Sequence, residues 1–98
     1  MFVLEVTYNA PLDTVKAVLP AHKAWLDEHF KTGTFLASGR KEPRDGGIII
    51  AAGKDRARID EILAKDPFVT EGVGTYRVVA FTATTTAPEL ERYRETLD

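Results

Sequence analysis

The sequence predicts an α+β fold whose elements follow in the order β-α-β-β-α-β, and three observations support this prediction. Apolar side chains alternate along residues 2–8, which is typical of a strand with one buried face. Apolar residues recur every three or four positions between residues 12 and 30, which is typical of a helix. Residues 48–52 are apolar without interruption, which is typical of a strand at the centre of a sheet.

The first strand and the first helix have the clearest patterns. One face of the strand carries Phe2, Leu4, Val6 and Tyr8. The helical stripe that follows contains Leu12, Val15, Leu19, His22, Leu26 and Phe30. Pro20 lacks an N–H donor and disfavours helix at the residue before it. We therefore expect a break or kink near Leu19, with the main helix over residues 20–31.

The second half of the chain supplies the remaining elements. Further strands are expected over residues 34–38, 48–52 and 75–83, with a polar turn over residues 40–47. A second helix is expected over residues 55–65. The dipeptide Asp66-Pro67 should end this helix, because the residue before a proline resists the α conformation.

This order of elements is that of the ferredoxin-like fold, an antiparallel four-stranded sheet with two helices on one face. Two helices cover only one face of the sheet, yet apolar residues point to both. A second copy of the chain is the simplest cover for the other face, so we expect a homodimer. All 98 residues form one domain in this interpretation, and residues 86–98 are a tail that we expect to be helical and to pack on the partner subunit.

Composition excludes several classes of protein. Thirteen Lys and Arg residues against fifteen Asp and Glu residues give a net charge of −2, without the basic surplus of a nucleic-acid-binding protein. The chain has no cysteine, which excludes disulfides, zinc fingers, thiol catalysis and iron–sulfur clusters. No apolar run approaches the roughly 18 residues of a membrane span, and no secretory leader pattern is present. We therefore expect a cytoplasmic protein without nucleic-acid or membrane partners.

The two histidines are the first candidates for chemistry. His22 and His29 are separated by about 10.5 Å along a helix that rises 1.5 Å per residue. They cannot share a metal ion, whose bonds to histidine nitrogen are about 2 Å long, so we expect no metal site. His29 is near the end of the helix and is most simply a surface or capping residue. His22 lies within the apolar stripe, where it is either a packed core histidine or a functional one.

Asp66 also has two interpretations. Aspartate before proline is common at helix-terminating turns. A carboxylate at a helix C-terminus is, however, slightly disfavoured by the helix dipole, which suggests a cationic or hydrogen-bonding partner nearby. Because both helices cover the same face of the sheet, the end of the second can approach the middle of the first. His22 and Asp66 are therefore predicted to form a pair.

An ordered set of short motifs surrounds these two residues: His22, Trp25-Leu26, Gly33, Phe35-Leu36, Gly39, Asp66-Pro67-Phe68 and Gly72. This set resembles the YCII-related (YciI-like) family from the first strand to the last, leaving the tail outside. The resemblance implies a dimeric α+β barrel, similar in shape to muconolactone isomerase. It also implies a His–Asp pair in a pocket, matching His22 and Asp66. One branch of that family uses the pair to eliminate chloride from a chlorinated hydroxyhydroquinone.

Two positions depart from the family pattern. Leu19 stands where family members often carry an arginine, and Gly39-Arg40 stands where they often carry Gly-Pro. The first departure removes a cation that would hold an anionic group of a substrate. Arg40 either replaces that charge from the end of the second strand or is a solvated turn residue.

The first functional hypothesis is a small-molecule lyase or isomerase that transfers a proton on a small cyclic or aromatic substrate, without a cofactor. Histidine suits this role because imidazole gains and loses a proton near neutral pH. His22 would transfer the proton, and Asp66 would fix its tautomer. The residues expected to contact the substrate are Ser38, Gly39, Arg40, Trp25 and Phe68, with Tyr76 as a further aromatic wall.

The second hypothesis is a non-catalytic ligand-binding or dimerisation module, in which the His–Asp pair is structural. Access distinguishes the two, because a catalytic His22 must reach a pocket, whereas a structural one needs no opening. A third class, the haem-binding dimeric α/β barrels, would need His22 or His29 as an axial ligand. No second feature of the sequence supports that class.

Overall fold

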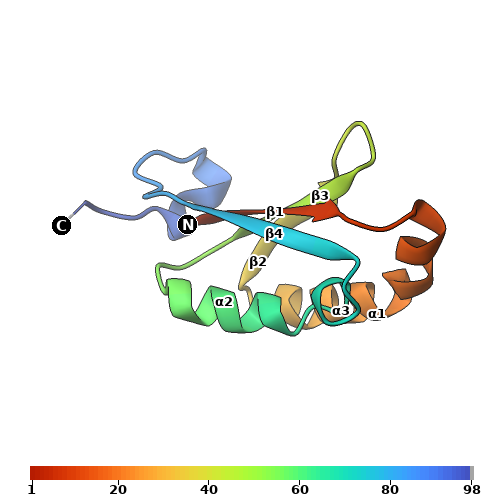
Figure 1. Cartoon of the computed structure of the whole chain (residues 1–98). Helices are drawn as coiled ribbons and strands as arrows, with labels where there is room; N and C mark the ends of the chain where they lie inside the picture. The colour runs from red at the N-terminus through yellow and green to blue at the C-terminus, as the bar shows by residue number, and fades with distance from the viewer. Residues whose placement is uncertain (98) are drawn as a thin grey trace.

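A computed structural model describes residues 1–97 and shows one sheet with helices packed against it (Figure 1). The strands are β1 (Phe2–Tyr8), β2 (Phe35–Arg40), β3 (Gly46–Ala51) and β4 (Gly74–Ala80). The helices are α1 (Leu12–Lys31), α2 (Arg56–Ala64) and α3 (Pro67–Thr70), and a 3₁₀ helix, η1, spans Pro88–Tyr93. The last strand is shorter than predicted, because it ends at Ala80 rather than at residue 83.

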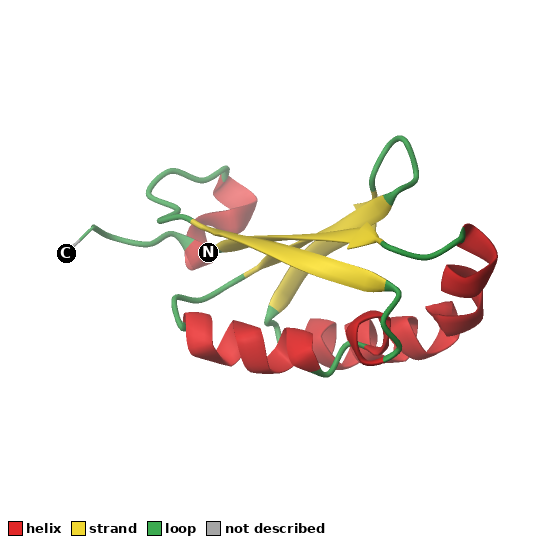
Figure 2. Ribbon diagram, in the orientation of Figure 1, coloured by secondary structure: helices red, strands yellow, loops and turns green. Residues whose placement is uncertain are grey.

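The sheet is antiparallel throughout, with the strand order β2-β3-β1-β4. The three α-helices lie on one side of it, and η1 is the one helical segment of residues 1–97 on the other side, near the chain ends (Figure 2). This arrangement confirms the predicted ferredoxin-like fold. It also confirms that the continuously apolar strand, β3, is central. No helix within residues 1–97 has the length and apolar character required to cross a membrane.

The hydrophobic core lies between the sheet and the helices. Its strand residues are those of the predicted alternating face of β1, where Phe2, Leu4 and Val6 are all buried. The helical side of the core is formed by Trp25, Ile59, Ile62 and Leu63, with Val15 and Phe68 in a second cluster around Val6. This second cluster lies next to the site described below, so the core and the site share side chains.

The first helix is kinked but not broken, so the predicted start of the main helix at residue 20 is wrong, whereas the alternative expectation of a kink is confirmed. Helix α1 continues from Leu12 to Lys31 with Pro20 inside it, and its first turns run at an angle to the remainder (Figure 1). A proline in a helix interior costs about 3 kcal/mol and bends the helix. Val15 before the proline and Trp25 after it are both buried, so both halves of α1 are held against the sheet. Packing therefore outweighs the lost hydrogen bond.

Helix α2 ends at Ala64, just before Asp66-Pro67, and Asp66 has extended backbone angles, as predicted for a residue before proline. Asp66 is also the N-cap of α3, where its side chain accepts a hydrogen bond from the N–H of Phe68. Pro67 occupies the first helical position, which proline favours because its ring presets the backbone. The electrostatic penalty expected at a helix C-terminus does not apply, since a carboxylate is favoured at an N-terminus.

The C-terminal tail folds back on its own chain as far as residue 97. Glu95 accepts a hydrogen bond of 2.8 Å from the N–H of Ala83 and pairs with the α-amino group of Met1 at 2.9 Å. The hydrogen bond from Ala83 and the charge of Met1 lower the pKa of Glu95. The tail is helical only in η1, and its contact with a partner subunit stays a prediction. Asp98, the last residue of the predicted tail, lies outside the described residues.

Candidate active site

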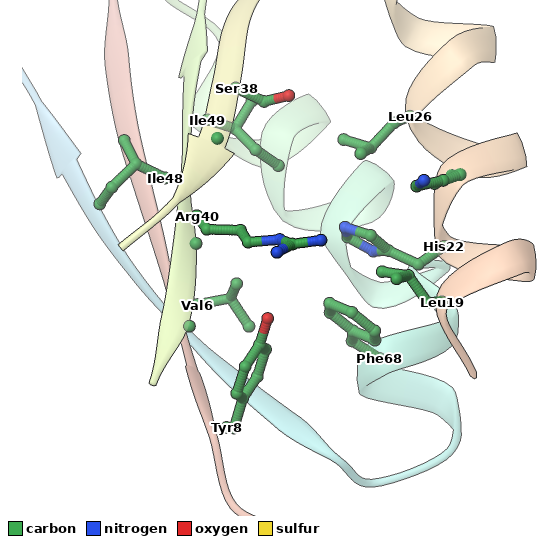
Figure 3. Close-up of a pocket in the computed structure, with 14 residues that line it drawn as sticks. Val6, Tyr8, Leu19, His22, Leu26, Ser38, Arg40, Ile48, Ile49 and Phe68 are labelled. Carbon is green, nitrogen blue, oxygen red and sulfur yellow. The ribbon is translucent and has the colours of Figure 1, made fainter. Parts of the chain in front are cut away.

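A cavity of about 170 Å³ lies between the sheet and α1, with α3 at one end (Figure 3). The residues that line it are Val6, Tyr8, Leu19, His22, Lys23, Leu26, Ser38, Gly39, Arg40, Gly46, Gly47, Ile48, Ile49 and Phe68. A protein cavity of about 150 Å³ is large enough for a benzene molecule. The cavity therefore has room for one six-membered ring.

The floor of the cavity follows from the strand register. Gly47 pairs with Val6 on one side and with Arg40 on the other, and paired residues project from the same face of a sheet. Gly47 has no side chain, so the space above it stays open between Val6 and Arg40. A Cβ atom at this position would lie only 3.1 Å from the carbonyl oxygen of Gly39. The close approach of two strands thus favours glycine at the centre of the floor.

His22 projects from α1 into the cavity wall and forms the predicted pair with Asp66. Its Nδ1 atom lies 2.7 Å from Oδ1 of Asp66, and the His22 side chain is only 9% exposed. The imidazole ring stacks on Phe68, with ring centroids 3.7 Å apart and an angle of 7° between the planes. The hydrogen bond and the stacking together fix both the position and the orientation of the ring.

Asp66 is fully buried, and hydrogen bonds compensate its lost hydration. Oδ1 accepts from the N–H of Phe68 at 3.0 Å, and Oδ2 accepts from the hydroxyl of Tyr76 at 2.5 Å. A buried carboxylate without such donors would cost several kcal/mol. Both oxygens lie where hydrogen-bond donors reach them, which suits a carboxylate. We therefore assign the hydrogen between the two residues to Nδ1 of His22.

Tyr76 does not form the aromatic wall that the sequence suggested. It lies behind Asp66, outside the lining of the cavity. Burial, and then the negative charge of Asp66 and the hydrogen bond to it, raise the pKa of the Tyr76 hydroxyl far above its usual value. The hydroxyl therefore keeps its proton and acts as a permanent donor to Asp66.

The second ring nitrogen of His22, Nε2, is available for chemistry. It makes no hydrogen bond within residues 1–97. Among the residues of this range that are not exposed, Nε of Arg44 is the only fully buried side-chain nitrogen or oxygen without a partner, so Nε2 of His22 keeps some contact with solvent. With the proton on Nδ1, the neutral ring has a lone pair on Nε2 that can accept a proton.

Most of the predicted contact residues line the cavity. Phe68 stacks under His22, while Ser38, Gly39 and Arg40 come from β2 on the opposite wall (Figure 3). Trp25 does not reach the cavity. It is buried, and its indole N–H donates to the carbonyl of Ile62 at 3.2 Å, which ties α1 to α2.

Several lining residues were not predicted from the sequence, and Tyr8 and Lys23 are the polar ones among them. Tyr8 belongs to the alternating face of β1 and was counted there as core. Lys23 follows His22 directly, but a helical stripe does not indicate on which side of His22 a cavity opens. His29 lies outside the cavity, and partial burial lowers its pKa. Residues 1–97 contain no cluster of three or more side chains suited to bind a metal ion.

Removal of the Tyr76 hydroxyl should destabilise the protein, because it leaves one oxygen of a buried carboxylate without its donor. We expect Tyr76→Phe to lower the free energy of unfolding by about 1–3 kcal/mol in denaturant titrations near pH 7. Tyr8→Phe is the matched control, since the Tyr8 hydroxyl makes no hydrogen bond within residues 1–97. That control should change the free energy by less than about 0.5 kcal/mol.

The difference in the free energy of unfolding between Tyr76→Phe and the unaltered protein should also depend on pH. The pKa of Tyr76 is raised in the folded state above its unfolded value near 10. The stabilisation is therefore fully present below about pH 10 and is lost as the pH rises above that value. Equal stabilities of the Tyr76 and Tyr8 variants at neutral pH would contradict this account of the network.

Comparisons with known proteins place the fold and the family. The structure of 5-chloro-2-hydroxyhydroquinone dehydrochlorinase from Burkholderia phenoliruptrix AC1100, in complex with 2,5-dihydroxybenzoquinone, is similar to this one with a TM-score of 0.68. The two chains are 17% identical, and the match covers 83% of this chain and 93% of the other. At that identity the likeness establishes a shared fold. None of the curated proteins compared with this chain matches it.

The family model of the YCII-related domain matches residues 1–82. The match contains every strand, both members of the His22–Asp66 pair and the whole lining of the cavity. It leaves out η1, as the resemblance of the sequence motifs also did. The chain therefore belongs to the YCII-related domain family.

Proposed function

We propose that this protein is a small-molecule lyase in which Nε2 of His22 accepts a proton from a single-ring substrate. One observation carries the proposal. A buried carboxylate orients His22 through Nδ1, while Nε2 is open to solvent beside a cavity that has room for one ring. An oriented imidazole with one free nitrogen at a cavity is the arrangement that general base catalysis requires.

The proposed reaction begins with transfer of a proton from the substrate to Nε2 of His22. The positive charge that forms on the ring is stabilised by Asp66, whose negative charge is 2.7 Å away. The chlorine-bearing carbon must be sp³ for this step, as it is in a keto tautomer of the ring, so that the electron pair left on the substrate forms a new double bond while a leaving group such as chloride departs with its bonding electrons. The proton then returns to solvent from Nε2. Ser38 and the backbone at Gly39 are proposed to donate hydrogen bonds to the developing oxyanion.

Elimination is proposed before isomerisation because the structural neighbour is a dehydrochlorinase. Isomerisation would start with the same step and would return the proton to another carbon of the substrate. Apolar walls formed by Phe68, Leu19 and Leu26 suit a flat ring in either case. Hydroxylated and chlorinated aromatic rings, of which 5-chloro-2-hydroxyhydroquinone is an example, are therefore the first substrates to assay.

The alternative function is a non-catalytic module with a structural His–Asp pair. Such a pair would be most stable if sealed in the core. The access of solvent to Nε2 and the place of His22 in the cavity wall favour catalysis instead. The hydrogen bonds of Asp66 would orient His22 for catalysis and would also stabilise the fold, since they connect α1 to α3 and β4.

We also propose that the protein is a homodimer that pairs through the sheet face opposite the helices. Val3 pairs with Ile50 on one side and with Val79 on the other, so these three apolar side chains form a row across that face. Val79 is 41% exposed. Ile48 also points away from the cavity and toward this face (Figure 3). A second copy would remove this apolar surface from water.

Replacement of His22 should abolish most of the activity without unfolding the protein. We expect His22→Gln to lower the rate of chloride release from 5-chloro-2-hydroxyhydroquinone at least about 100-fold, the smallest effect typical of a lost general base. Asp66→Asn should lower the rate as well, because the amide cannot stabilise the charged ring. His29→Gln is the control and should not alter the rate, since His29 lies outside the cavity.

Circular dichroism and thermal unfolding would establish that each variant is folded. A folded His22→Gln variant with an unchanged rate would contradict the proposed role of His22. Failure of the unaltered protein to release halide from a panel of halogenated phenols would contradict the assignment as a lyase, and a panel of lactones would then test isomerisation.

A charge on the open sheet face should prevent dimerisation. We expect the unaltered chain to elute as a dimer in size-exclusion chromatography with light scattering, and Val79→Lys to elute as a monomer. Ala17→Lys, an equivalent change at an exposed position of α1, should leave the mass unchanged. A monomeric mass for the unaltered chain would refute the proposed dimer.

A further inference from the structure

The charged side chains that line the cavity are cationic. Lys23 and Arg40 lie beside His22 in the lining, and no aspartate or glutamate of residues 1–97 is part of it. Asp66 is the nearest buried carboxylate, but it is fully inaccessible to solvent and lies on the far side of the imidazole. Its two oxygens already accept from His22, Phe68 and Tyr76. A ligand in the cavity therefore meets positive charge without a competing exposed carboxylate.

Arg40 is the cation with the clearest position in the cavity. Its pairing with Gly47 places it on the cavity side of the sheet, and its guanidinium extends across the cavity toward His22 (Figure 3). The guanidinium makes no hydrogen bond or ion pair within residues 1–97. A turn arginine that only contacts solvent is expected to extend into water. The direction of Arg40, across apolar walls and toward His22, favours a role in binding a ligand instead.

The neighbouring cation, Lys41, provides a direct contrast. Its ammonium group lies 3.4 Å from Glu5 and 3.3 Å from Asp45, so it is already paired. Two adjacent cations at the end of β2 thus differ in what they contact. Lys41 has two carboxylate partners within the chain, whereas Arg40 has none in the part of the chain that the structure describes.

We infer that the substrate is a single ring that carries an ionised oxygen substituent, either a carboxylate or an acidic ring hydroxyl, and that Arg40 binds this group. The inference rests on the proposed function for the location of the ring beside His22. The planar guanidinium can donate two parallel hydrogen bonds to such a group, and these charge-assisted bonds are stronger than neutral ones. Arg40 thereby becomes the residue that determines charge specificity.

An anionic substrate would also assist the proton transfer. A bound anion beside Arg40 would offset the charge of the guanidinium and would stabilise the positive charge that forms on the His22 ring during the proposed transfer. A neutral ring of the same size would fill the cavity without this effect, so the enzyme would discriminate by charge as well as by shape.

Binding measurements with matched ligands test the inference. Benzoate and benzamide have nearly the same shape and differ in charge, and the anion of 2,5-dihydroxybenzoquinone and neutral 2,5-diaminobenzoquinone provide the same contrast for ring oxygens. We expect the anion of at least one pair to bind at least about tenfold more tightly than its neutral partner, in NMR titrations of the ¹⁵N-labelled protein at low salt. The pair with the larger ratio identifies the substituent as carboxylate or ring hydroxyl.

Arg40→Gln should reduce this ratio to about one, and Arg40→Lys should retain part of it. Lys41→Gln is the matched control, because it removes the same charge from the adjacent residue and should leave the ratio unchanged. The inference would be overturned by equal binding of the anion and the neutral ligand within both pairs. It would also be overturned if the preference for the anion survived Arg40→Gln, or if it were lost in Lys23→Gln but not in Arg40→Gln. No binding of either anion to the unaltered protein would overturn it as well.

The assay does not depend on turnover, so it separates this inference from the proposed function. His22→Gln should retain the preference for the anion although it loses the activity. If the preference for anions depends on Arg40 but His22→Gln keeps its full activity, the binding site is supported and the proton transfer by His22 is refuted. If His22→Gln loses its activity but the preference for anions does not depend on Arg40, the binding site alone is refuted.

Discussion

The carboxylate of Asp66 is the group on which both the fold and the site depend. It joins three elements, because it contacts α1 through His22, caps α3 through the N–H of Phe68 and accepts from Tyr76 on β4. A fully buried charge is costly unless every oxygen is satisfied, so the three elements must be in place for the charge to be stable. One of the bonds that satisfy Asp66 also sets the orientation of the His22 ring.

The sheet supplies the other half of the site. The register that pairs Gly47 with Val6 and Arg40 leaves an opening in the floor and places a cation at its edge. Apolar side chains from α1 and α3 close the opposite side. A base of fixed orientation, an apolar slot for one ring and a guanidinium without a partner in residues 1–97 are the features on which we base the proposed proton transfer on a small, anionic cyclic molecule. The chemistry proposed for the protein thus follows from contacts that its fold already requires.

The strands and the His22–Asp66 pair were predictable from the sequence, because the local pattern of apolar residues and the topology are sufficient to place them. The period of residues 2–8 and the apolar run at residues 48–52 predict two central strands, and the topology then brings His22 near Asp66. The role of Tyr76 was not predictable, because it depends on which residue of β4 lies beside Asp66 at the start of α3. That placement follows from the pairing of β4 with β1. Trp25 was placed in the site wrongly, since the spacing of a helical stripe does not distinguish core from cavity.

The proposed chemistry requires that Nδ1 of His22, and not Nε2, carries the hydrogen of the neutral ring. The ¹⁵N chemical shifts of the two ring nitrogens report directly which of them carries it. The account predicts that, when the ring is neutral, Nδ1 carries the hydrogen and Nε2 does not, and that Asp66→Asn weakens this preference. A hydrogen on Nε2 with a bare Nδ1 would contradict the account. It would require a protonated Asp66, and it would leave Nε2 as a donor that cannot accept a proton from a substrate.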